Sequence, residues 1–188
     1  MSSKPSGLEV ASLAETLADG KRIPYVFGHE KLTSADCQGF IEAVVRKLGG
    51  AMSFRGSNDM FRNAVNFVVP IKQAKEQGIM KPGGLLFVLK NDGGEIPWGY
   101  KDGMGNASHV GFYTGLKYFS VHSSSAADDV VGTDETYKWT HYGEAKSIDY
   151  SDNSKPVDSV PPVDGSLTNV LLALESALVG LKKFMGGG

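Results

Sequence analysis

Apolar residues recur at helical spacing through the first half of the chain. In four segments they occupy positions such as i, i+3 and i+4, which share one face of a helix. The pattern predicts helices over residues 8–18 and 35–48, a shorter helix over 58–66 and a weaker one over 71–77. Ser34 precedes the second segment and is expected to cap it, because a serine hydroxyl accepts a hydrogen bond from the first helical turn.

From Pro82 onward the apolar residues form short runs bounded by glycine and polar turns, which is typical of strands. The runs predict strands over residues 85–89, 109–114, 118–122, 130–131, 137–140 and 147–150. Helices first and strands second predict an α+β fold rather than alternating β-α-β units. A glycine-rich loop over 91–108 separates the first two strands, and its aromatic Trp98 and Tyr100 either wall a substrate cleft or pack over the strand ends.

A change of composition near residue 151 predicts a boundary. Residues 151–165 are rich in Ser, Pro and Asp and are expected to form an extended linker. Beyond it, apolar residues recur at alternating spacings of four and three: Leu167, Leu171, Leu174, Leu178, Leu181 and Met185. We therefore expect a main domain over 1–150, the linker, and an amphipathic helix with a glycine tail over 166–188. That helix either docks on its own domain or joins the chain to a second copy or a partner.

Composition excludes several classes of partner. The chain has 188 residues, a formal net charge of −2 and scattered basic residues, so we expect no nucleic-acid partner. No run of about 18 apolar residues occurs, so we expect no membrane span. The apolar stretch near the N-terminus contains Glu9, Glu15 and Asp19, which indicates that it is not a secretory signal.

The motifs of phosphate loops, serine hydrolases and zinc helices do not occur, and we expect neither a cofactor nor a metal. What remains is the single cysteine, Cys37, at the start of the second predicted helix. The N–H groups and dipole there favour a thiolate, although a lone cysteine in a helix is more often a buried apolar residue. His109 and His122 lie at strand ends that an antiparallel hairpin would bring together; otherwise they are ordinary polar residues.

Five segments decide between these alternatives. They are Pro24-Tyr25-Val26-Phe27-Gly28, Asp36-Cys37-Gln38-Gly39-Phe40, Lys81-Pro82-Gly83-Gly84-Leu85-Leu86-Phe87, Ser108-His109-Val110-Gly111-Phe112-Tyr113 and Val121-His122-Ser123. In this order and spacing they resemble the NlpC/P60 family of cell-wall cysteine peptidases, and the resemblance covers roughly residues 8–150. It implies a papain-like α+β fold, in which N-terminal helices pack on a small antiparallel sheet, with the C-terminal helix added to it.

The resemblance also implies a role for the residues that match the family motifs. Cys37 aligns with the nucleophile, His109 with the general base, and His122 with the third residue, which orients that base. Tyr25 matches a tyrosine that lies beside the nucleophile in such enzymes. Its hydroxyl and the Cys37 N–H are expected to hold the oxyanion.

Other positions depart from the family pattern or lie at its margin. The departures are Phe27 for tryptophan, His29 for glycine, Gln38 for serine and Gly84 for aspartate. None removes a member of the triad, but Phe27 and Gly84 are expected to affect specificity. Further residues expected around the substrate are Asp36, Ser108 and Trp98, of which Asp36 is an acid of the first helical turn rather than a catalytic carboxylate. His141 is expected at the surface or at the rim of the substrate cleft.

Members of the family generally hydrolyse the γ-D-glutamyl bond to the diamino acid of peptidoglycan stem peptides, and the resemblance implies a cysteine peptidase of this kind. The alternatives are an N-acetylmuramoyl-L-alanine amidase or an acyltransferase with the same triad, or a non-catalytic wall-binding module. With no secretory signal, such an enzyme is expected to reach the wall through lysis, virion or injection machinery, as phage endolysins, tail proteins and antibacterial effectors do. Residues 166–185 are then a candidate contact for a second copy or a phage-assembly partner.

Overall fold

Four helices and seven strands occur in the residues that the computed structural model describes, which are 4–19, 23–90, 100–124 and 138–151. In chain order they are α1 Gly7–Ala18, β1 Glu30–Lys31, β2 Ser34–Ala35, α2 Cys37–Lys47, α3 Ser57–Asn63, β3 Val65–Pro70, α4 Ile71–Glu76, β4 Gly84–Lys90, β5 Asn106–Tyr113, β6 Ser120–Val121 and β7 His141–Ala145. The predicted α+β class is confirmed.

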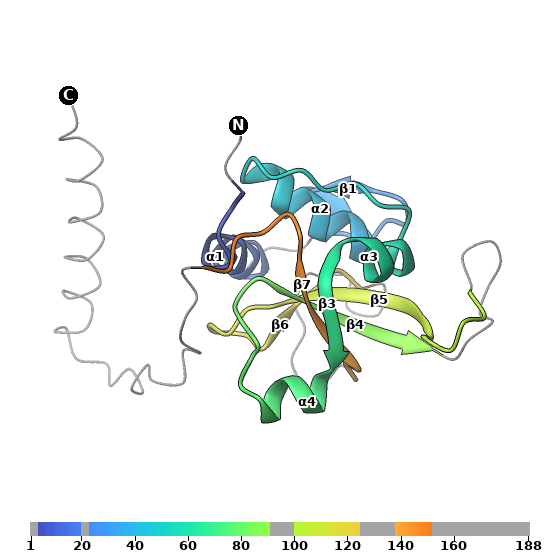
Figure 1. Cartoon of the computed structure of the whole chain (residues 1–188). Helices are drawn as coiled ribbons and strands as arrows, with labels where there is room; N and C mark the ends of the chain where they lie inside the picture. The colour runs from blue at the N-terminus through green and yellow to red at the C-terminus, as the bar shows by residue number, and fades with distance from the viewer. Residues whose placement is uncertain (1–3, 20–22, 91–99, 125–137, 152–188) are drawn as a thin grey trace, which may run out of the picture. The chain divides into compact units, whose positions relative to one another are not determined.

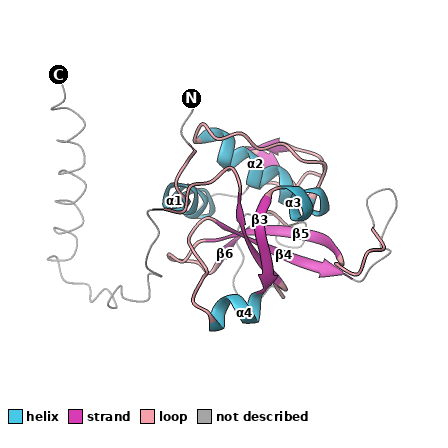
Figure 2. Cartoon of the chain, viewed as in Figure 1, coloured by secondary structure: helices cyan, strands magenta, loops and turns pink. Residues whose placement is uncertain are grey.

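Five strands form one antiparallel sheet in the order β3-β7-β4-β5-β6, while β1 and β2 form a small separate pair. Figure 1 shows α1, α2 and α3 gathered on one side of the sheet, with α4 at the end of β3. Figure 2 separates the helical part from the strands at a glance. These three helices therefore pack against one face of the sheet, whereas α4 contributes Ala74 to the cluster on the other face.

The two faces of the sheet bury different sets of apolar residues. In β4, Leu85 and Phe87 point into the larger core, together with residues of α1, α2 and α3. Leu86 lies between them and therefore points to the opposite face, because side chains alternate along a strand. There it packs in a smaller cluster with Trp139 and Tyr142. Each face of the sheet is thus covered by its own apolar core.

The strand β5 carries an irregularity close to its start. Val88 of β4 pairs with His109, but the next residue, Leu89, pairs with Ala107, so Ser108 is an extra residue in the ladder. Such bulges bend a strand and change the direction of its side chains. Further along, β6 pairs only with Phe112 and Tyr113, and within the described residues the first half of β5 is therefore an edge of the sheet.

Several predicted elements differ from those observed. The strands predicted over 137–140 and 147–150 are wrong, because the chain pairs between them as β7, where both β3 and β4 supply partners. The helix predicted over 58–66 ends at Asn63, and Val65–Pro70, which contains three valines, joins β7 as strand β3. Ser34 belongs to β2 and is not the cap of α2. The predicted strand over 130–131, Trp98, and all of the linker and tail after Ser151 lie outside the described residues.

Candidate active site

Cys37 is the first residue of α2, and the preceding residue fixes its position. Asp36 is the N-cap of the helix, and its Oδ1 accepts a hydrogen bond from Gly39 N–H at 2.7 Å. Its other oxygen, Oδ2, accepts from Gly28 N–H at 2.8 Å. One buried carboxylate therefore ties the turn at Gly28 to the first turn of α2. This is the structural role of Asp36, which caps the helix from outside its first turn.

The glycine two residues after Cys37 is required by packing. A Cβ built on Gly39 would lie 2.0 Å from the His29 carbonyl oxygen and 2.9 Å from Glu30 Cα. These atoms belong to the backbone and cannot move aside as a side chain would. Glycine at this position therefore allows the start of α2 to lie directly against the segment that begins β1.

His109 and His122 meet on neighbouring strands. His109 lies in β5 and His122 follows β6, and the antiparallel pairing of these strands brings both imidazoles to one place. His109 Nε2 lies 3.0 Å from His122 Nδ1, and the two rings are perpendicular. Both side chains are buried, at 8% and 2% exposure. The hairpin arrangement inferred from the sequence is therefore observed.

Cys37 contacts the same strand that carries His109. The backbone N–H of Val110, the residue after His109, hydrogen-bonds to the Cys37 sulfur. The chain around His122 is tied to the same place, because Ser123 Oγ donates to the Ala35 carbonyl at 2.7 Å. The start of α2 thus lies at the edge of β5 where the histidine pair is buried, and Cys37 itself stays partly exposed.

Burial sets the protonation state of the cysteine. Desolvation, together with the negative charge of Asp36, raises the pKa of Cys37 to about 11. Hydrogen bonds from the backbone N–H groups of Val110, Gln38 and Cys37 act in the opposite direction but are weaker. The expectation that the helix terminus favours a thiolate is therefore wrong for the resting protein, because burial outweighs the local N–H groups.

Burial also keeps both histidines neutral. Desolvation, with a smaller contribution from the charge of His122, lowers the pKa of His109 to about 3. Desolvation lowers the pKa of His122 to about 4, against a backbone hydrogen bond at Ser123 that raises it. At neutral pH the resting site therefore holds a thiol and two uncharged imidazoles.

Trp139 is a third aromatic side chain at the histidine pair, and no sequence pattern pointed to it. Its indole stacks on the His109 ring with centroids 5.4 Å apart and planes inclined by 19°. The same indole meets His122 edge to face, at 5.3 Å and 86°. Trp139 belongs to no motif of the five matched segments, and its segment comes well after them, so only the folded chain reveals the contact.

The remaining residues expected around the substrate have varied positions. Tyr25 forms an isolated backbone bridge with Ala35, two residues before Cys37. Ser108 is exposed, and its hydroxyl donates to the Val88 carbonyl at 3.3 Å. Phe27 is 86% exposed at the turn beside Gly28. His141 is half-buried in β7 and contacts the Phe61 ring edge to face.

Two departures from the family pattern have structural reasons. Gln38 points along α2, where its Nε2 donates to Glu42 Oε1 at 2.5 Å, and Phe54 N–H donates to the same oxygen at 2.6 Å. Gln38 is therefore a buried polar residue of the helix packing. A Cβ on Gly84 would lie 2.3 Å from the Tyr142 ring, so the large Tyr142 side chain occupies the space that an aspartate would need.

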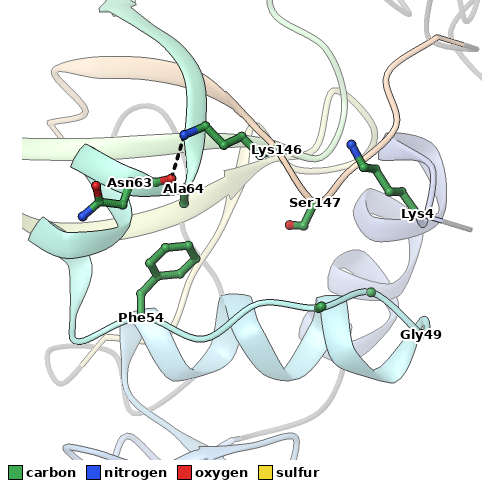
Figure 3. Close-up of a pocket in the computed structure, with 9 residues that line it drawn as sticks. Lys4, Gly49, Phe54, Asn63, Ala64, Lys146 and Ser147 are labelled. Carbon is green, nitrogen blue, oxygen red and sulfur yellow. Dashed lines mark hydrogen bonds between the residues drawn. The ribbon is translucent and has the colours of Figure 1, made fainter. Parts of the chain in front are cut away.

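A cavity of about 340 Å³ lies at the other end of α2. Its lining includes Gly49 and Phe54 from the chain after α2, Lys146 from the turn after β7, and Lys4. Figure 3 shows the Phe54 ring near Ala64 and the Lys146 ammonium at the Asn63 carbonyl, where the hydrogen bond is 3.0 Å. The cavity contains none of the residues predicted for the site.

The described residues contain neither a metal-binding cluster nor a membrane-spanning helix. No group of three or more His, Cys, Asp or Glu side chains is placed to hold a metal ion in residues 4–19, 23–90, 100–124 and 138–151. None of the helices in that same part of the chain combines the length and apolar character needed to cross a membrane.

Comparison with solved structures identifies the fold. NlpC1 and NlpC2 from Trichomonas vaginalis align with 74% and 77% of this chain at 19% and 18% identity, with TM-scores of 0.52 and 0.53. This chain covers 43% and 48% of those two proteins, less than half of each. The NlpC/p60 domain of the peptidoglycan hydrolase SagA aligns with 74% of this chain and is itself covered to 98%, at 18% identity and a TM-score of 0.53.

Two comparisons of the sequence find no relative. No protein-family model matches the sequence, and a search of curated proteins also finds no match. The structural alignments nevertheless have TM-scores of 0.52 and 0.53 and cover about three quarters of this chain. This chain therefore has the papain-like α+β fold of NlpC/P60 domains.

Proposed function

We propose that this protein is a cysteine hydrolase that cleaves peptide bonds in the stem peptides of bacterial peptidoglycan, with Cys37, His109 and His122 as its triad. The observation that carries the proposal is the buried His109–His122 pair, 3.0 Å between ring nitrogens, on the strand whose next N–H contacts the Cys37 sulfur. A base oriented by a third group beside a nucleophile is the arrangement that covalent catalysis needs. The substrate class is supported by the fold, since SagA is a peptidoglycan hydrolase.

The first chemical step forms a thioester. Because the resting thiol and imidazole are both neutral, the proton moves from Cys37 Sγ to His109 as the sulfur attacks the peptide carbonyl carbon. The carbonyl oxygen becomes an oxyanion, which the Cys37 N–H and the Tyr25 hydroxyl are proposed to hold. The C–N bond then breaks, and the leaving amine takes the proton from His109.

The second step releases the acid. A water molecule attacks the thioester carbon and gives its proton to His109, and the C–S bond breaks to regenerate the Cys37 thiol. The acyl fragment leaves as a carboxylic acid. Both steps require His109 to accept and return one proton, so they use the same imidazole and the same geometry.

The third residue sets the tautomer of the base. In the proposed arrangement His109 Nε2–H donates to His122 Nδ1, and Nδ1 of His109 exchanges the proton with Cys37. When His109 becomes an imidazolium, the 3.0 Å hydrogen bond to His122 stabilises its positive charge. A neutral imidazole here performs the orienting role that an aspartate performs in other triads.

The proposal is tested by Cys37→Ala on purified peptidoglycan. We expect the release of new amino groups to fall by at least about 10³-fold, because removal of the nucleophile leaves only binding and oxyanion stabilisation. Ser34→Ala is the matched control, since Ser34 lies in the neighbouring strand β2 and its hydroxyl bonds only to His29 among the described contacts. Unchanged release by Cys37→Ala in a folded protein would overturn the assignment.

Mass spectrometry of the products separates the remaining alternatives. Cleavage of the γ-D-glutamyl bond produces a free amino group on the diamino-acid fragment, whereas an amidase produces a stem peptide that begins with L-alanine. An acyltransferase instead joins the acyl fragment to an added amine. Binding to cell walls with no product, in a protein whose Cys37 resists iodoacetamide, would indicate a wall-binding module.

A further inference from the structure

We propose that Trp139 is a positioning residue that shields the His109–His122 hydrogen bond from water and fixes the planes of both rings. The inference deepens the proposed function, on which its catalytic part rests, because it names a residue through which the base acts. The observation behind it is that one indole contacts both imidazoles, stacked on His109 and edge-on to His122.

The position of Trp139 is fixed through its ring and through the neighbouring backbone. Its Nε1–H donates to Ser120 Oγ in β6 at 3.1 Å, which fixes the rotation of the ring. Its backbone is fixed through Thr140, whose N–H and hydroxyl both donate to the Phe87 carbonyl, at 2.9 and 3.0 Å. Thr140 Oγ1 also accepts from Leu89 N–H at 2.9 Å. These bonds tie Trp139 to β4 and β6, on either side of the strand that carries His109.

The close approach depends on a glycine. A Cβ built on Gly111 would lie 2.7 Å from Trp139 Cη2 and 2.9 Å from His122 Cβ. Any larger residue would push apart the indole and the second histidine. Glycine at position 111 of the matched His109-Val110-Gly111 segment is therefore required for Trp139 to contact the histidine pair.

The contact has a consequence for the chemistry of the base. Trp139 is 6% exposed and covers one face of the His109 ring, so water is excluded from that face. A hydrogen bond between two rings is stronger and better directed when water does not compete for its atoms. Among the described titratable groups His122 is the one whose charge acts on His109, so the indole contributes by burial and orientation.

The test replaces Trp139 by leucine and by phenylalanine in the full chain. Nuclear magnetic resonance of the imidazole nitrogens reports tautomer and titration of both histidines, and iodoacetamide reports the reactivity of Cys37 against pH. We expect Trp139→Leu to move the His109 titration upward, because loss of burial restores its ordinary pKa, and to change the Cys37 profile. We expect kcat for peptidoglycan to fall about 10- to 100-fold with little change in KM, and Trp139→Phe to recover most of it.

Two further variants separate positioning from simple core packing. Phe61→Leu removes a buried aromatic ring that packs on Phe87 and His141 but makes no described contact with His109 or His122. It is therefore expected to lower stability without moving the titrations of His109 and His122. Ser120→Ala removes only the hydroxyl that orients the indole, and is expected to shift them slightly even if Trp139→Leu fails to fold.

The readouts distinguish this inference from the proposed function. If the wild-type chain does not cleave peptidoglycan but the titrations shift as expected, the function fails and the positioning role stands. The inference is overturned if the Trp139 and Ser120 variants behave like the Phe61→Leu control. In that case the titrations of both histidines and the pH profile of Cys37 labelling do not change, and Trp139 is only a packing residue.

Discussion

The two ends of α2 differ in what surrounds them. At Cys37, the Asp36 carboxylate caps the helix, the Val110 N–H of β5 bonds to the sulfur, and the side chain stays partly exposed. At Gly49, the chain leaves a cavity of about 340 Å³ with two lysines in its lining and neither a cysteine nor a histidine. The cavity therefore contains none of the residues proposed for the reaction, and the candidate site is located by the identity of the neighbouring groups rather than by a cavity volume.

Burial acts differently at the two ends. Near Cys37 it removes charge, since the cysteine pKa is raised and both histidine pKa values are lowered, so the site is neutral at rest. Near Gly49 the Lys146 side chain is exposed and reaches a backbone carbonyl at the surface. Because the thiol and both imidazoles are neutral at rest, no thiolate–imidazolium pair has to be held in the buried site before the sulfur attacks.

The largest expected effect contrasts these ends directly. His109→Ala removes the general base, and we expect peptide release from peptidoglycan to fall by about 10²- to 10⁴-fold. Lys146→Ala removes a charged group from the cavity and is expected to leave release within about twofold, because no described contact joins it to the triad. The two rates are compared on one peptidoglycan preparation. A comparable loss in Lys146→Ala would mean that the cavity also takes part in the reaction, and an unchanged rate in His109→Ala would remove His109 from it.

The stability of the protein in acid is expected to depend on the buried histidines near Cys37 and not on the cavity near Gly49. An unfolded histidine binds a proton near pH 6.5, whereas His109 and His122 stay neutral in the fold down to about 3 and about 4. Unfolding therefore takes up protons between pH 6.5 and 4, and the free energy of unfolding falls as the pH falls. Each histidine contributes a slope of about 1.4 kcal/mol per pH unit.

Urea unfolding of variants at several pH values checks this slope. His122→Asn removes one of the two groups and is expected to lower the slope by about one histidine's share. Lys146→Ala, at the cavity end, is expected to leave the slope unchanged. A wild-type free energy of unfolding that stays constant between pH 6.5 and 4 would show that neither histidine is kept neutral by burial.

The placement of Cys37 and His109 in the fold was predictable because each lies in a segment whose packing a nearby glycine determines. Gly39 follows Cys37 and admits the His29 backbone, and Gly111 follows His109 and admits the Trp139 ring. A motif that pairs a reactive residue with such a glycine therefore describes a packing requirement as well as a chemical one. For this reason the helix start and the histidine pair could be placed from sequence.

Contacts made by distant segments were not predictable. Trp139 reaches the histidines only because Thr140 bonds to β4, which no local pattern records. The strand His141–Ala145 has a glycine and charged or polar residues, and it pairs because two neighbouring strands are available on either side. Tertiary pairing decides the structure of such segments more than their own propensity does.

At the cap of α2, tertiary contacts also decide which residue takes the position. Substitution of the cap is expected to have the smallest effect of the variants compared. Ser34 has the right residue type for a cap, but Asp36 takes that position because its second oxygen also binds Gly28 N–H. Asp36→Ala should lower the free energy of unfolding by about 1 to 2 kcal/mol through loss of the cap. Gly49→Ala, at the other end, should cost about 1 kcal/mol because Gly49 has a φ of +84°.

The two substitutions differ in what they do to the cysteine. The charge of Asp36 is one cause of the raised Cys37 pKa, so Asp36→Asn should move the pH midpoint of iodoacetamide labelling downward. Gly49→Ala lies a whole helix away and should leave that midpoint unchanged while lowering stability. If both variants leave the midpoint in place, burial alone raises the pKa of the Cys37 thiol. The two ends of α2 then differ in desolvation, and the capping carboxylate contributes nothing to that difference.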